Sequence, residues 1–567
     1  MAVISSRFNI SVPSTDILTY IFDSPWDSTQ GYPDDEPIIL SARGIDQPSC
    51  TFNELKHLVK CFACGFKTLA PSNPRVVLYG TLNVYLPAVL LGALGAGASC
   101  NICPAYPLAE TTARLRTINA DYVFFQPEHL ETVTAAAKIA GVPVENLFIL
   151  DESETCEKLQ SPVSHWASLL DLINGPSFQW KRLSDDESKK TTALFCHTSG
   201  TTGFPKMAER THYGLIGNTA QLLYRYHLKP RERHETWFCT FMYAGIGFIL
   251  YGLLMPLKAR YKTIFMPQFD ANGFLSAIEA FQPTSLHTPK HILQKLLADY
   301  ANADFSCISS LRTGGAMIPI SMRDEWVQRH GSQCEVVCGM TEGGIHFASD
   351  PRQIEIDETV GELLPNLQAK VVDHNGQILP IGQSGEILIR NPFAMTGYLN
   401  GLVATKEVFT DDGYIKTGDI GMVNESGRWY IIGRLKVSTL ETLVVINYII
   451  DKMAQDLYKR DGYHVMGSEI EAAVLSHPEV LAAAVIAVKP PEAVDDEPVP
   501  RGYLVRRLGS TLTPDAFDAW ALTTLPKRFQ LDGGFQILEA LPVSMAGKVD
   551  RNALRQRSII ELQFIGA

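Results

Sequence analysis

Residues 194–212 read LFCHTSGTTGFPKMAERTH, an apolar strand that runs directly into a loop of small residues. The loop consists of Thr198, Ser199, Gly200, Thr201, Thr202 and Gly203, and Lys206 follows it. Small residues let backbone N–H groups and hydroxyls surround phosphate oxygens, while a lysine supplies positive charge. A Walker A loop requires glycine directly before the lysine and Ser or Thr after it, but Pro205 and Met207 stand there. The stretch therefore predicts a phosphate-binding loop of another type, with an ordinary Ser/Thr-rich turn as the alternative.

Short apolar strands alternate with amphipathic helical stretches around this loop, from about residue 35 to residue 350. Examples are RVVLYG before VYLPAVLLGAL, DYVFFQ before LETVTAAAKIAG, and TSLHT before HILQKLLADY. Such alternation indicates a layered α/β fold with parallel sheets. From about residue 353 to 432 the pattern changes to short strands separated by Gly, Asn and Asp turns, which predicts β-hairpins.

The chain after Gly462 is mixed again, with a helix expected in GSEIEAAVLSHP, a strand in AAAVIAV and a capped helix in TPDAFDAWALTTL. We predict an α/β fold. It has a large N-terminal body of layered, mostly parallel sheets with helices plus a β-rich subdomain, and a small mobile α+β C-terminal domain. The expected boundaries are an N-terminal domain at residues 1–433, its β-rich subdomain at about 353–432, a hinge at 434–461 and a C-terminal domain at 462–567.

Charge and composition narrow the function classes. The formal net charge of -12 and the pI of about 5.7 argue against a nucleic-acid partner, which would need a basic patch. The N-terminal stretch has no basic region followed by an apolar core, and QFIGA is not a peroxisomal address. The apolar run at 76–98 contains Asn83, Pro87 and several glycines, which favours a buried strand–turn–helix over a membrane span. We expect a cytoplasmic protein without a membrane span.

Eleven cysteines in a chain without an expected signal peptide predict reduced thiols. Two Cys-x-x-Cys pairs, Cys61/Cys64 and Cys100/Cys103, keep a zinc site open as the less favoured alternative. The first pair lies on an apolar helical pattern facing a core, and the gap between the pairs exceeds the ~15–20 residues of a four-cysteine zinc site. His287 and His291 have metal-like spacing, but Pro289 between them disfavours an aligning helix, so we expect a loop leading into a helix.

Six further motifs follow the phosphate loop in a fixed order. They are RTGGA (312–316), CGMTEGG (338–344), GEILIR (385–390), YIKTGD (414–419), IIGRLK (431–436) and PVSMAGKVDR (542–551). Together these seven motifs resemble the adenylate-forming superfamily of acyl- and aryl-CoA synthetases, peptide-synthetase adenylation domains and luciferases. The closest resemblance is to 4-coumarate:CoA ligase-like acyl-CoA ligases. It implies that a carboxylate attacks the α-phosphate of ATP, giving an acyl-adenylate and pyrophosphate, and that a thiol then displaces AMP. The implied cofactors are ATP, Mg²⁺ and CoA, or the phosphopantetheine of a carrier protein.

The resemblance also implies roles for individual residues. Residues 198–206 would surround the β- and γ-phosphates, Thr341 would bind the α-phosphate, and Glu342 would help to bind Mg²⁺. Lys548 would bridge the carboxylate and the α-phosphate, which makes the expected catalytic set Lys206, Thr341, Glu342 and Lys548. Taken singly, Glu342 is more often a charge at a helix N-terminus and Lys548 a solvated surface charge, so these roles depend on the joint pattern.

Further residues are expected to line the substrate sites. Asp419 and Arg434 would bind the ribose, although Asp419 alone could be a turn residue, and Cys338, Gly339 and Met340 would complete the nucleotide site. Gly314 and Gly315 would line the adenine and acyl sites, where the lack of a side chain permits close approach. The acyl pocket would include Met242, Tyr243, Ala244 and Gly245, and the CoA-side loop would be Gly462, Tyr463 and His464.

The chain departs from the family pattern at three places. Cys338 stands where the family usually has an aromatic residue on the adenine, so we expect weaker ATP binding or compensation elsewhere, because stacking contributes ~1–3 kcal/mol per base. The acyl-gating histidine of many CoA ligases is absent, and Met242, Tyr243 and Ala244 stand near its place. A lysine pair typical of the thioester side is replaced by Lys459 followed by Asp461-Gly462.

The acid and its acceptor stay open at this level. A pocket near Tyr243, Gly315 and Met340 would be apolar and aromatic, without an obvious acidic partner for an α-amine, which favours an aryl or medium-chain acyl acid. A free-standing CoA ligase is the leading hypothesis, and a stand-alone enzyme that loads a carrier protein is the alternative. A catalytically impaired member of the family that acts as a binding protein is the third reading.

Residues 437–455 interrupt the expected hinge. Deleting Val437–Gln455 joins GRLK directly to DLYKRDGYHVMGSEIE and restores the family pattern. Val437-Ser438 can be encoded GTAAGT and Gln455 CAG, the usual ends of an intron. The segment is therefore interpreted as a translated intron, with a genuine hinge insertion as the alternative, and the run LVVINYII would then be an aggregation hazard if unpaired. A transcript that contains this segment as its sole form would overturn the intron reading.

Overall fold

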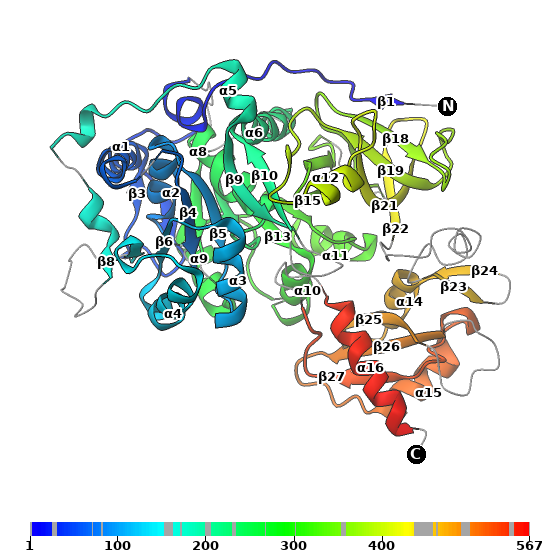
Figure 1. The fold of residues 1–567 in the computed structure, drawn as a ribbon. Coiled ribbons are helices and arrows are strands. Elements are labelled where there is room, and N and C mark those ends of the chain that lie inside the picture. Colours follow the sequence, from blue (N-terminus) through cyan, green and yellow to red (C-terminus); the bar gives the residue numbers. More distant parts are fainter. Residues whose placement is uncertain are drawn as a thin grey trace.

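The computed structural model contains two large β-sheets with helices on both faces, a smaller antiparallel sheet and a C-terminal α+β unit (Figure 1). It describes residues 3–24, 31–70, 72–80, 83–151, 163–170, 173–198, 206–228, 234–266, 268–300, 302–352, 359–435, 457–460, 463–488, 499–543 and 549–565.

The first large sheet has eight strands and is parallel except at one end. Strands β4 to β9 run parallel to their neighbours, whereas β10 is antiparallel to both β9 and β20. Its strands, in spatial order, are β20 (Gly397–Tyr398), β10 (Met207–Thr211), β9 (Thr192–His197), β5 (Ser99–Cys103), β4 (Arg75–Tyr79), β6 (Tyr122–Phe125), β7 (Leu147–Ile149) and β8 (Ser164–His165). The hairpin of β9 and β10 places the two ends of the expected phosphate loop side by side.

The second large sheet has nine strands, six of which are parallel. Strand β3 at one edge and strands β16 and β17 at the other are antiparallel to their neighbours. The spatial order is β17 (Glu362–Leu363), β16 (Gly344–Ala348), β15 (Gln333–Met340), β14 (Ser310–Gly314), β13 (Ser285–Pro289), β11 (Thr236–Cys239), β12 (Lys262–Phe265), β2 (Pro37–Ser41) and β3 (Cys50–Thr51).

Helices cover both faces of each large sheet, so the N-terminal body has five layers. Helices α3 and α4 pack on the outer face of the eight-stranded sheet, α9, α10 and α11 on the outer face of the nine-stranded sheet, and α1, α2, α6 and α8 between the two sheets. The helices of the body are α1 (Phe52–Leu69), α2 (Leu86–Gly95), α3 (Leu108–Ile118), α4 (Leu130–Ala140), α5 (Asp185–Lys190), α6 (His212–Tyr226), α7 (Ile246–Phe248), α8 (Met255–Ala259), α9 (Ala271–Phe281), α10 (Lys290–Asp299), α11 (Ile320–His330) and α12 (Leu402–Val408). The π-helical segment η6 (Ile249–Leu254) joins α7 to α8.

Local sequence explains where several of these elements begin. Helix α1 starts at a capping box, in which the Glu54 N–H donates to the Thr51 hydroxyl at 3.0 Å and the Thr51 N–H donates to the Glu54 carboxylate at 2.8 Å. Such a cap stabilises a helix by about 1 kcal/mol. Helix α10 begins directly after Pro289, the last residue of β13, because proline has no N–H to donate and fits a helix start.

The third sheet is antiparallel and lies beside the nine-stranded sheet (Figure 1). Its order is β1 (Ile4–Ser5), β18 (Gln368–Val372), β19 (Gly385–Arg390), β21 (Ile415–Val423) and β22 (Trp429–Arg434). The short N-terminal strand β1 pairs with β18, so residues near the start of the chain close an edge of this sheet.

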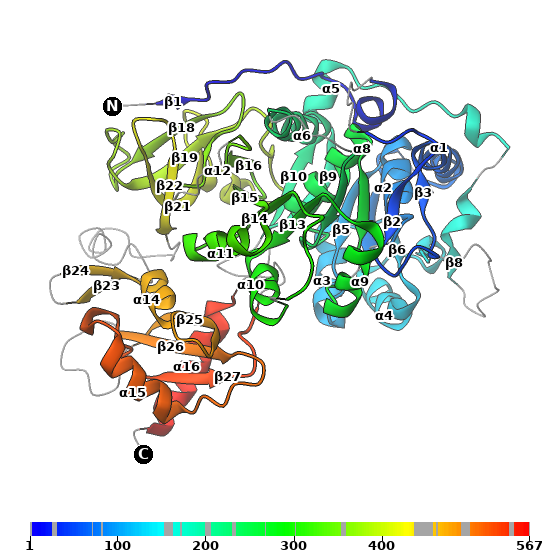
Figure 2. The same ribbon diagram turned by 180° about the vertical axis from the view of Figure 1, so that it is seen from behind.

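The C-terminal unit lies at one end of the body, next to α10, as both ribbon views show (Figures 1 and 2). Helices α14 (Gly467–Val474) and α15 (Pro514–Thr524) pack on one face of its three-stranded sheet, and α16 (Arg551–Ile565) packs on the other. The sheet consists of β25 (Val480–Val488), β26 (Val499–Arg506) and β27 (Phe535–Leu538), and a hairpin of β23 (Leu457–Arg460) and β24 (Tyr463–Met466) precedes it.

The predicted fold class is confirmed, and one local prediction is wrong. The apolar run at 76–98 contains most of β4 and all of helix α2, as expected for a buried strand–turn–helix. His287, however, belongs to strand β13 and not to a loop, because Pro289 is accommodated at the strand end without interrupting it. No helix in the described part of the chain is long and apolar enough to cross a membrane.

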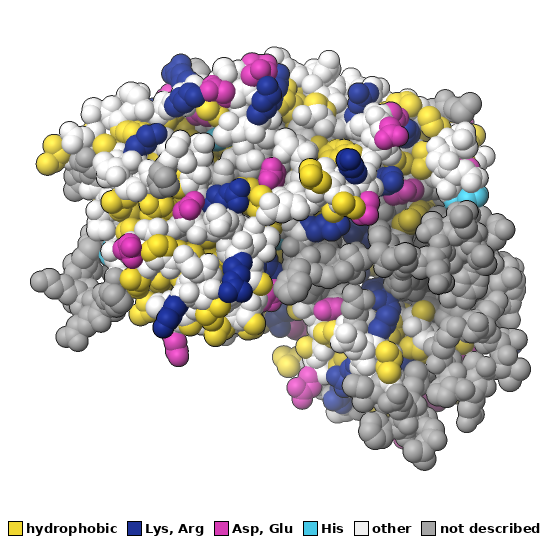
Figure 3. Space-filling view, in the orientation of Figure 1, with side chains coloured by type: hydrophobic (Ala, Val, Ile, Leu, Met, Phe, Trp, Pro, Cys, Tyr) yellow, Lys and Arg dark blue, Asp and Glu magenta, His cyan; other side chains and the backbone are white. Residues whose placement is uncertain are grey.

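Basic and acidic side chains are interspersed over the described residues on the face shown in Figure 3. Mixed signs of this kind favour solubility and do not create a single-sign field. The formal net charge of -12 is therefore not gathered in one patch of that face.

Candidate active site

The ends of the expected phosphate loop are fixed by the β9–β10 hairpin. The Thr198 N–H donates to the Lys206 carbonyl at 2.9 Å, so both ends of the loop leave the sheet together. The Lys206 ammonium lies 5.1 Å from the centre of the Tyr398 ring. Ser199, Gly200, Thr201, Thr202 and Gly203 lie outside the described residues.

A buried hydrogen-bond chain lies beneath this loop, at His197. The Arg114 guanidinium donates to His197 Nδ1 at 2.6 Å, and His197 Nε2 lies 3.2 Å from Asn101 Oδ1. Because Arg114 can only donate, we assign the ring proton to Nε2. Burial and the neighbouring Arg114 charge lower the pKa of His197 to about 3, so the ring is neutral at physiological pH.

Thr341 and Glu342 form the turn that joins β15 to β16, at the point where the two large sheets meet. The Thr341 hydroxyl donates to the His197 carbonyl at 3.2 Å, which ties this turn to the base of the phosphate loop. Glu342 is buried, and the Tyr398 hydroxyl donates to its carboxylate at 2.5 Å. The structure therefore places Lys206 and Glu342 at the same tyrosine, with Thr341 next to Glu342 in the turn.

Arg210, in β10, supports the same turn by a hydrogen bond to its backbone. Its guanidinium donates to the Thr341 carbonyl at 2.7 Å, to the Phe393 carbonyl at 2.9 Å and to the side-chain oxygen of Asn218. Burial lowers the pKa of Arg210, and no carboxylate within the described residues forms an ion pair with it. Neutral acceptors thus fix this arginine, and it in turn fixes the backbone that carries Thr341.

The glycines of the site leave little room for side chains. Gly344, directly after the turn, has φ +77°, and a Cβ there would lie 2.0 Å from the Asn218 side-chain oxygen. Gly314 ends strand β14, where a Cβ would lie 2.3 Å from the Val337 carbonyl. Gly315 follows it with φ +78° and open space around its Cα, as expected for a position where a ligand approaches the backbone.

The expected nucleotide residues Cys338, Gly339 and Met340 occupy the last part of β15. The pairing of β15 with β16 is irregular between Cys338 and Gly339, and a bulge of this kind often re-aims side chains next to active sites. Cys338 is half-buried, and its thiol lies within electrostatic reach of the Arg434 guanidinium.

Asp419 and Arg434 face one another across the β21–β22 hairpin. The Arg434 Nε donates to Asp419 Oδ1 at 2.6 Å, and the Asp419 charge is the main reason why the pKa of Arg434 is raised. Half of the Arg434 side chain is exposed, so the pair stands at a solvent-accessible edge where a ligand can reach it.

The expected acyl segment, residues 242–245, forms a tight turn after β11. The Gly245 N–H donates to the Met242 carbonyl at 2.9 Å, and Ala244 is buried. Tyr243 is half-buried, and burial raises the pKa of its phenol.

For the remaining predicted residues, the structure describes no side-chain positions. Lys548, Gly462 and the segment 437–455 lie outside the described residues. Tyr463 and His464 are described only as backbone of β24, opposite Arg460 and Lys459 of β23.

Sequence reasoning missed four side chains that complete the site: Arg114, His197, Arg210 and Tyr398. The partners of Arg114 and Arg210 in these contacts are 83 to 183 residues away in the sequence, so no local pattern indicates them. His346 was also missed. It is buried beside the Thr341–Glu342 turn, where burial and the Arg210 charge lower its pKa to about 3.

The alternative metal readings do not match the geometry of their residues. Cys100 and Cys103 lie on opposite faces of β5 and belong to different hydrophobic cores. His287 is in strand β13, whereas His291 is in helix α10. Among the described residues no group of three His, Cys, Asp or Glu side chains could hold a metal ion.

The residues at the turn nevertheless fit Mg²⁺ together with a triphosphate. Glu342 is a buried carboxylate that forms no ion pair with Lys or Arg within the described ranges, so its charge suits a cation that arrives with a ligand. Carboxylate and hydroxyl oxygens are ligands that Mg²⁺ prefers, and it usually binds through one or two carboxylates plus phosphate oxygens.

Comparison with known proteins identifies the family of this chain. The model of the AMP-binding enzyme family matches residues 26–399. The phenylacetyl-CoA ligase epaB of Aspergillus niger is 26% identical, over 97% of this chain and 98% of its own length. The probable 4-coumarate–CoA ligase 3 of Dictyostelium discoideum is 26% identical, over 94% of each chain.

The fold also matches solved structures. The anthranilate CoA ligase AuaEII, solved with anthranoyl-AMP, is 17% identical with a TM-score of 0.79, and the match covers 96% of this chain and 98% of that one. The family model spans well over half of the chain and includes the phosphate loop and the Thr341–Glu342 turn. This chain belongs to the AMP-binding enzyme family.

Proposed function

We propose that this chain is an AMP-forming acid–thiol ligase, which activates a carboxylic acid with ATP and transfers the acyl group to CoA. One observation carries the proposal: Lys206 and the buried Glu342 carboxylate meet at Tyr398, next to Thr341 and beside the ends of the predicted phosphate loop. Relatives named as phenylacetyl-CoA and 4-coumarate–CoA ligases support CoA as the acceptor and an aryl or acyl acid as the substrate.

In the first step, the acid carboxylate attacks the α-phosphorus of ATP and pyrophosphate leaves. Two anions must approach each other, so positive charge and hydrogen-bond donors lower the barrier. Lys206 and the loop at 198–206 would bind the β- and γ-phosphates, the Thr341 hydroxyl would donate to the α-phosphate, and Lys548 would bring the carboxylate and the α-phosphate together.

Mg²⁺ would be bound through Glu342 and, as a Lewis acid, would offset the negative charge of the phosphates. The protein prepares this site in two ways. The Tyr398 hydroxyl orients the Glu342 carboxylate, and Arg210 fixes the Thr341 carbonyl by a hydrogen bond of 2.7 Å. Tyr398 belongs to β20 and Arg210 to β10, so both supporting side chains come from one edge of the first sheet.

The nucleoside would lie between Gly314, Gly315 and the last residues of β15. The Asp419 carboxylate accepts hydrogen bonds and is oriented by Arg434, which suits the two ribose hydroxyls. The adenine would rest near Cys338, Gly339 and Met340, and the Met242–Gly245 turn would border the acyl group.

In the second step, a thiol attacks the acyl carbonyl and AMP leaves. The C-terminal unit would rotate about the hinge at 434–461 so that Gly462, Tyr463 and His464 face the site. A chain that loads the phosphopantetheine of a carrier protein shares the first step and is the second candidate. The cytoplasm is the compartment that suits these substrates and the ten cysteines of the described residues, none of which forms a disulfide there.

The test is a pyrophosphate-release screen over carboxylic acids, followed by mass analysis of the thioester formed with CoA. We expect acid-dependent pyrophosphate and an acyl-CoA product. Acyl-adenylate without acyl-CoA would support the carrier-protein alternative, and no acid-dependent pyrophosphate would leave only the binding-protein reading.

Lys206→Ala should abolish the pyrophosphate signal. Lys189→Ala is the matched control, because Lys189 also lies over a tyrosine ring, 5.2 Å from the centre of Tyr213, but it is at the surface and away from the loop. Equal activity of Lys206→Ala and the unmodified enzyme would contradict the assignment.

A further inference from the structure

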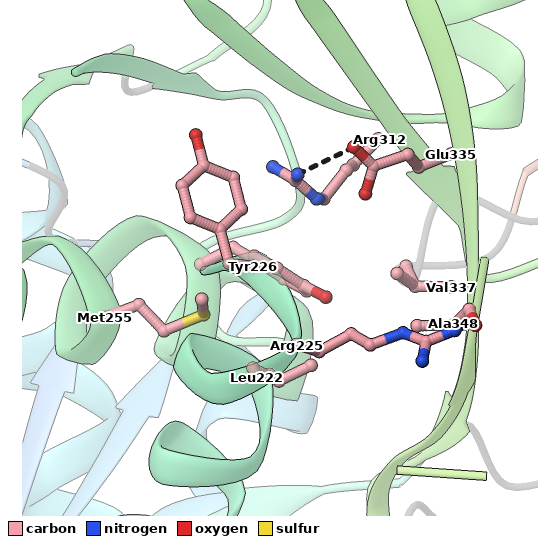
Figure 4. A pocket seen from close by; sticks show the side chains of 9 residues that line it. Leu222, Arg225, Tyr226, Met255, Arg312, Glu335, Val337 and Ala348 are labelled. Carbon is pink, nitrogen blue, oxygen red and sulfur yellow. Dashed lines mark hydrogen bonds and ion pairs between the residues drawn. The ribbon is translucent and has the colours of Figure 1, made fainter. Parts of the chain in front are cut away.

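A narrow cavity lies on the sheet face that leads to Gly314. Successive residues of a strand point to opposite faces, so Arg312 and Gly314 share one face, about 7 Å apart along β14. Glu335 and Val337 are their register partners on β15. Arg312, Glu335 and Val337 all line the cavity (Figure 4). It therefore lies directly beneath the end of β14, where the acid carboxylate would be activated.

The other walls come from α6, η6, α8 and β16. Leu222 and Tyr226 belong to α6, and Met255 opens α8, so the helices between the two sheets cover this face (Figure 4). The helix side is apolar except for Arg225 of α6, which is paired with Glu362 at 3.1 Å, and the other charged groups of the lining stand on the sheet. The cavity measures about 10 Å³, which is enough for one water-sized group.

On the sheet side, the charged wall is a buried ion pair. The Arg312 guanidinium donates to Glu335 Oε1 at 2.9 Å and to the Ser285 hydroxyl at 3.2 Å, and both charged side chains are less than a tenth exposed. These two bonds use two of the five N–H groups of the guanidinium. Arg312 also lies over the Tyr226 ring, 4.3 Å from its centre.

We propose that Arg312 and Glu335 are specificity-determining residues, which select an acid whose far end is uncharged and forms hydrogen bonds, such as a hydroxyl. This inference rests on the proposed function, because it takes the carboxylate end of the acid to lie at Gly314 and its tail to follow the sheet face downward. A hydroxyl both donates and accepts, and it has the size of the one water-sized group that the cavity admits.

Charge decides against the other polar groups. The charge of Arg225 is balanced by Glu362, and the Arg312–Glu335 pair is neutral overall. A second carboxylate on the acid would therefore gain the attraction of Arg312 but suffer the repulsion of Glu335. An ammonium group would meet the opposite combination. Either ion would lose its hydration without a net opposite charge to replace it, which is costly in a buried site.

The first test uses the unmodified enzyme and matched acids. Acid-dependent pyrophosphate release is measured for phenylacetic acid, para-hydroxyphenylacetic acid and para-carboxyphenylacetic acid, and for cinnamic acid with its para-hydroxy and para-carboxy forms. We expect kcat/KM to be at least about tenfold higher for the hydroxylated acid of each set, as one additional buried hydrogen bond allows, and the dicarboxylic acid to be the poorest. Equal values for hydroxylated and unsubstituted acids would overturn the inference.

The second test changes the charge of the cavity. Glu335→Gln leaves Arg312 with no carboxylate, so the dicarboxylic acid should become a substrate and gain at least about tenfold relative to the hydroxylated acid. A merely structural role of Glu335 would not produce a gained substrate. Loss of both activities in a folded Glu335→Gln protein, or an unchanged order of substrates, would contradict the proposal.

A double variant guards against instability, because removing one partner of a buried ion pair is usually more costly than replacing both with apolar residues. Arg312→Met with Glu335→Met should abolish the preference for the hydroxyl while pyrophosphate release with the unsubstituted acid persists. The matched control is Arg501→Met with Glu561→Met, a buried pair of the C-terminal unit with a 2.8 Å separation, which should leave the order of acids unchanged.

The two proposals fail in different ways. If no acid releases pyrophosphate, the proposed function itself is wrong. If several acids do so with no regard to their far ends, the ligase function stands and the role of Arg312 and Glu335 is refuted.

Discussion

Arg210 and Arg312 are both buried arginines on strands that lead to the site, but their partners differ. Arg210 donates to the Thr341 and Phe393 carbonyls and to Asn218, all of them neutral. Arg312 is paired with the Glu335 carboxylate and borders a cavity. The first arginine is therefore a fixed brace of the backbone, whereas the second is one half of a charge pair that a substrate can sense.

The two environments also act differently on the two guanidinium groups. Burial lowers the pKa of Arg210, and the charge of nearby Glu342, which is not paired with it, offsets this only in part. Burial lowers the pKa of Arg312 as well, but the Glu335 charge, with the nearby Tyr226, raises it overall. Removing Arg210 should therefore lower the stability of the protein, whereas removing Arg312 should change the choice of substrate.

The largest effect is expected for Arg210→Met. Three buried acceptors would lose their donor, so the free energy of unfolding should fall by about 3 kcal/mol and adenylation should be lost. Urea denaturation and pyrophosphate release measure these two quantities. Arg182→Met, which breaks an exposed ion pair with Asp23, should change stability by less than about 0.5 kcal/mol. If both variants were similarly stable, the proposed role of Arg210 in fixing the backbone at Thr341 would be contradicted.

Glu342→Gln should lower the rate of adenylation by about 100-fold, because the neutral amide cannot balance the charge of a divalent cation. The loss should shrink as the Mg²⁺ concentration rises, which a titration of activity against Mg²⁺ checks. Glu407→Gln, at an exposed position of α12, is the control. An unchanged Mg²⁺ dependence would contradict the role of Glu342.

Tyr398→Phe should have a smaller effect of the same kind. It removes the hydrogen bond to Glu342 but keeps the ring beneath Lys206, so about tenfold more Mg²⁺ should be needed for half-maximal activity. Tyr414→Phe offers a matched control, because the Tyr414 ring also faces a lysine, Lys370 at 4.2 Å, but outside the site. If both variants behave alike, Tyr398 does not position Glu342.

Cys338→Tyr is expected to improve the enzyme. An aromatic ring at this position would supply the stacking contact with adenine, so the KM for ATP should fall by about tenfold while kcat changes little. Steady-state kinetics against ATP measure this. A KM that is unchanged or raised would show that the adenine does not lie against Cys338.

The fold class was accessible from the sequence, and the motifs named candidate site residues whose roles remain predictions. Strand–helix alternation and hairpin turns are local signals, and they predicted elements such as β4, β6 and β19. The motifs around Thr341 and Asp419 marked residues that the structure places at the edge where the sheets meet. Each of these signals lies within a few neighbouring residues, so it can be recognised without knowing the tertiary contacts.

The rest depends on which strands become neighbours. Tyr398 reaches Glu342 across 56 residues, because the short strand β20 pairs with β10. Arg312 meets Glu335 only because β14 and β15 are parallel in one particular register. A sequence pattern shows that a strand exists, but it does not show its register, so both contacts were missed. For the same reason, the sequence alone showed no obvious acidic partner for an α-amine in the expected acyl pocket, and it did not indicate this ion pair.

A structure of the enzyme with a non-hydrolysable analogue of the para-hydroxyphenylacetyl adenylate tests the central claim most directly. The account predicts the adenylate phosphate between Lys206 and Thr341, the ring of the acid below Gly314, and its hydroxyl within hydrogen-bond distance of both Arg312 and Glu335. An acid whose far end lies elsewhere, with the Arg312–Glu335 cavity still closed by Tyr226 and Met255, would contradict it.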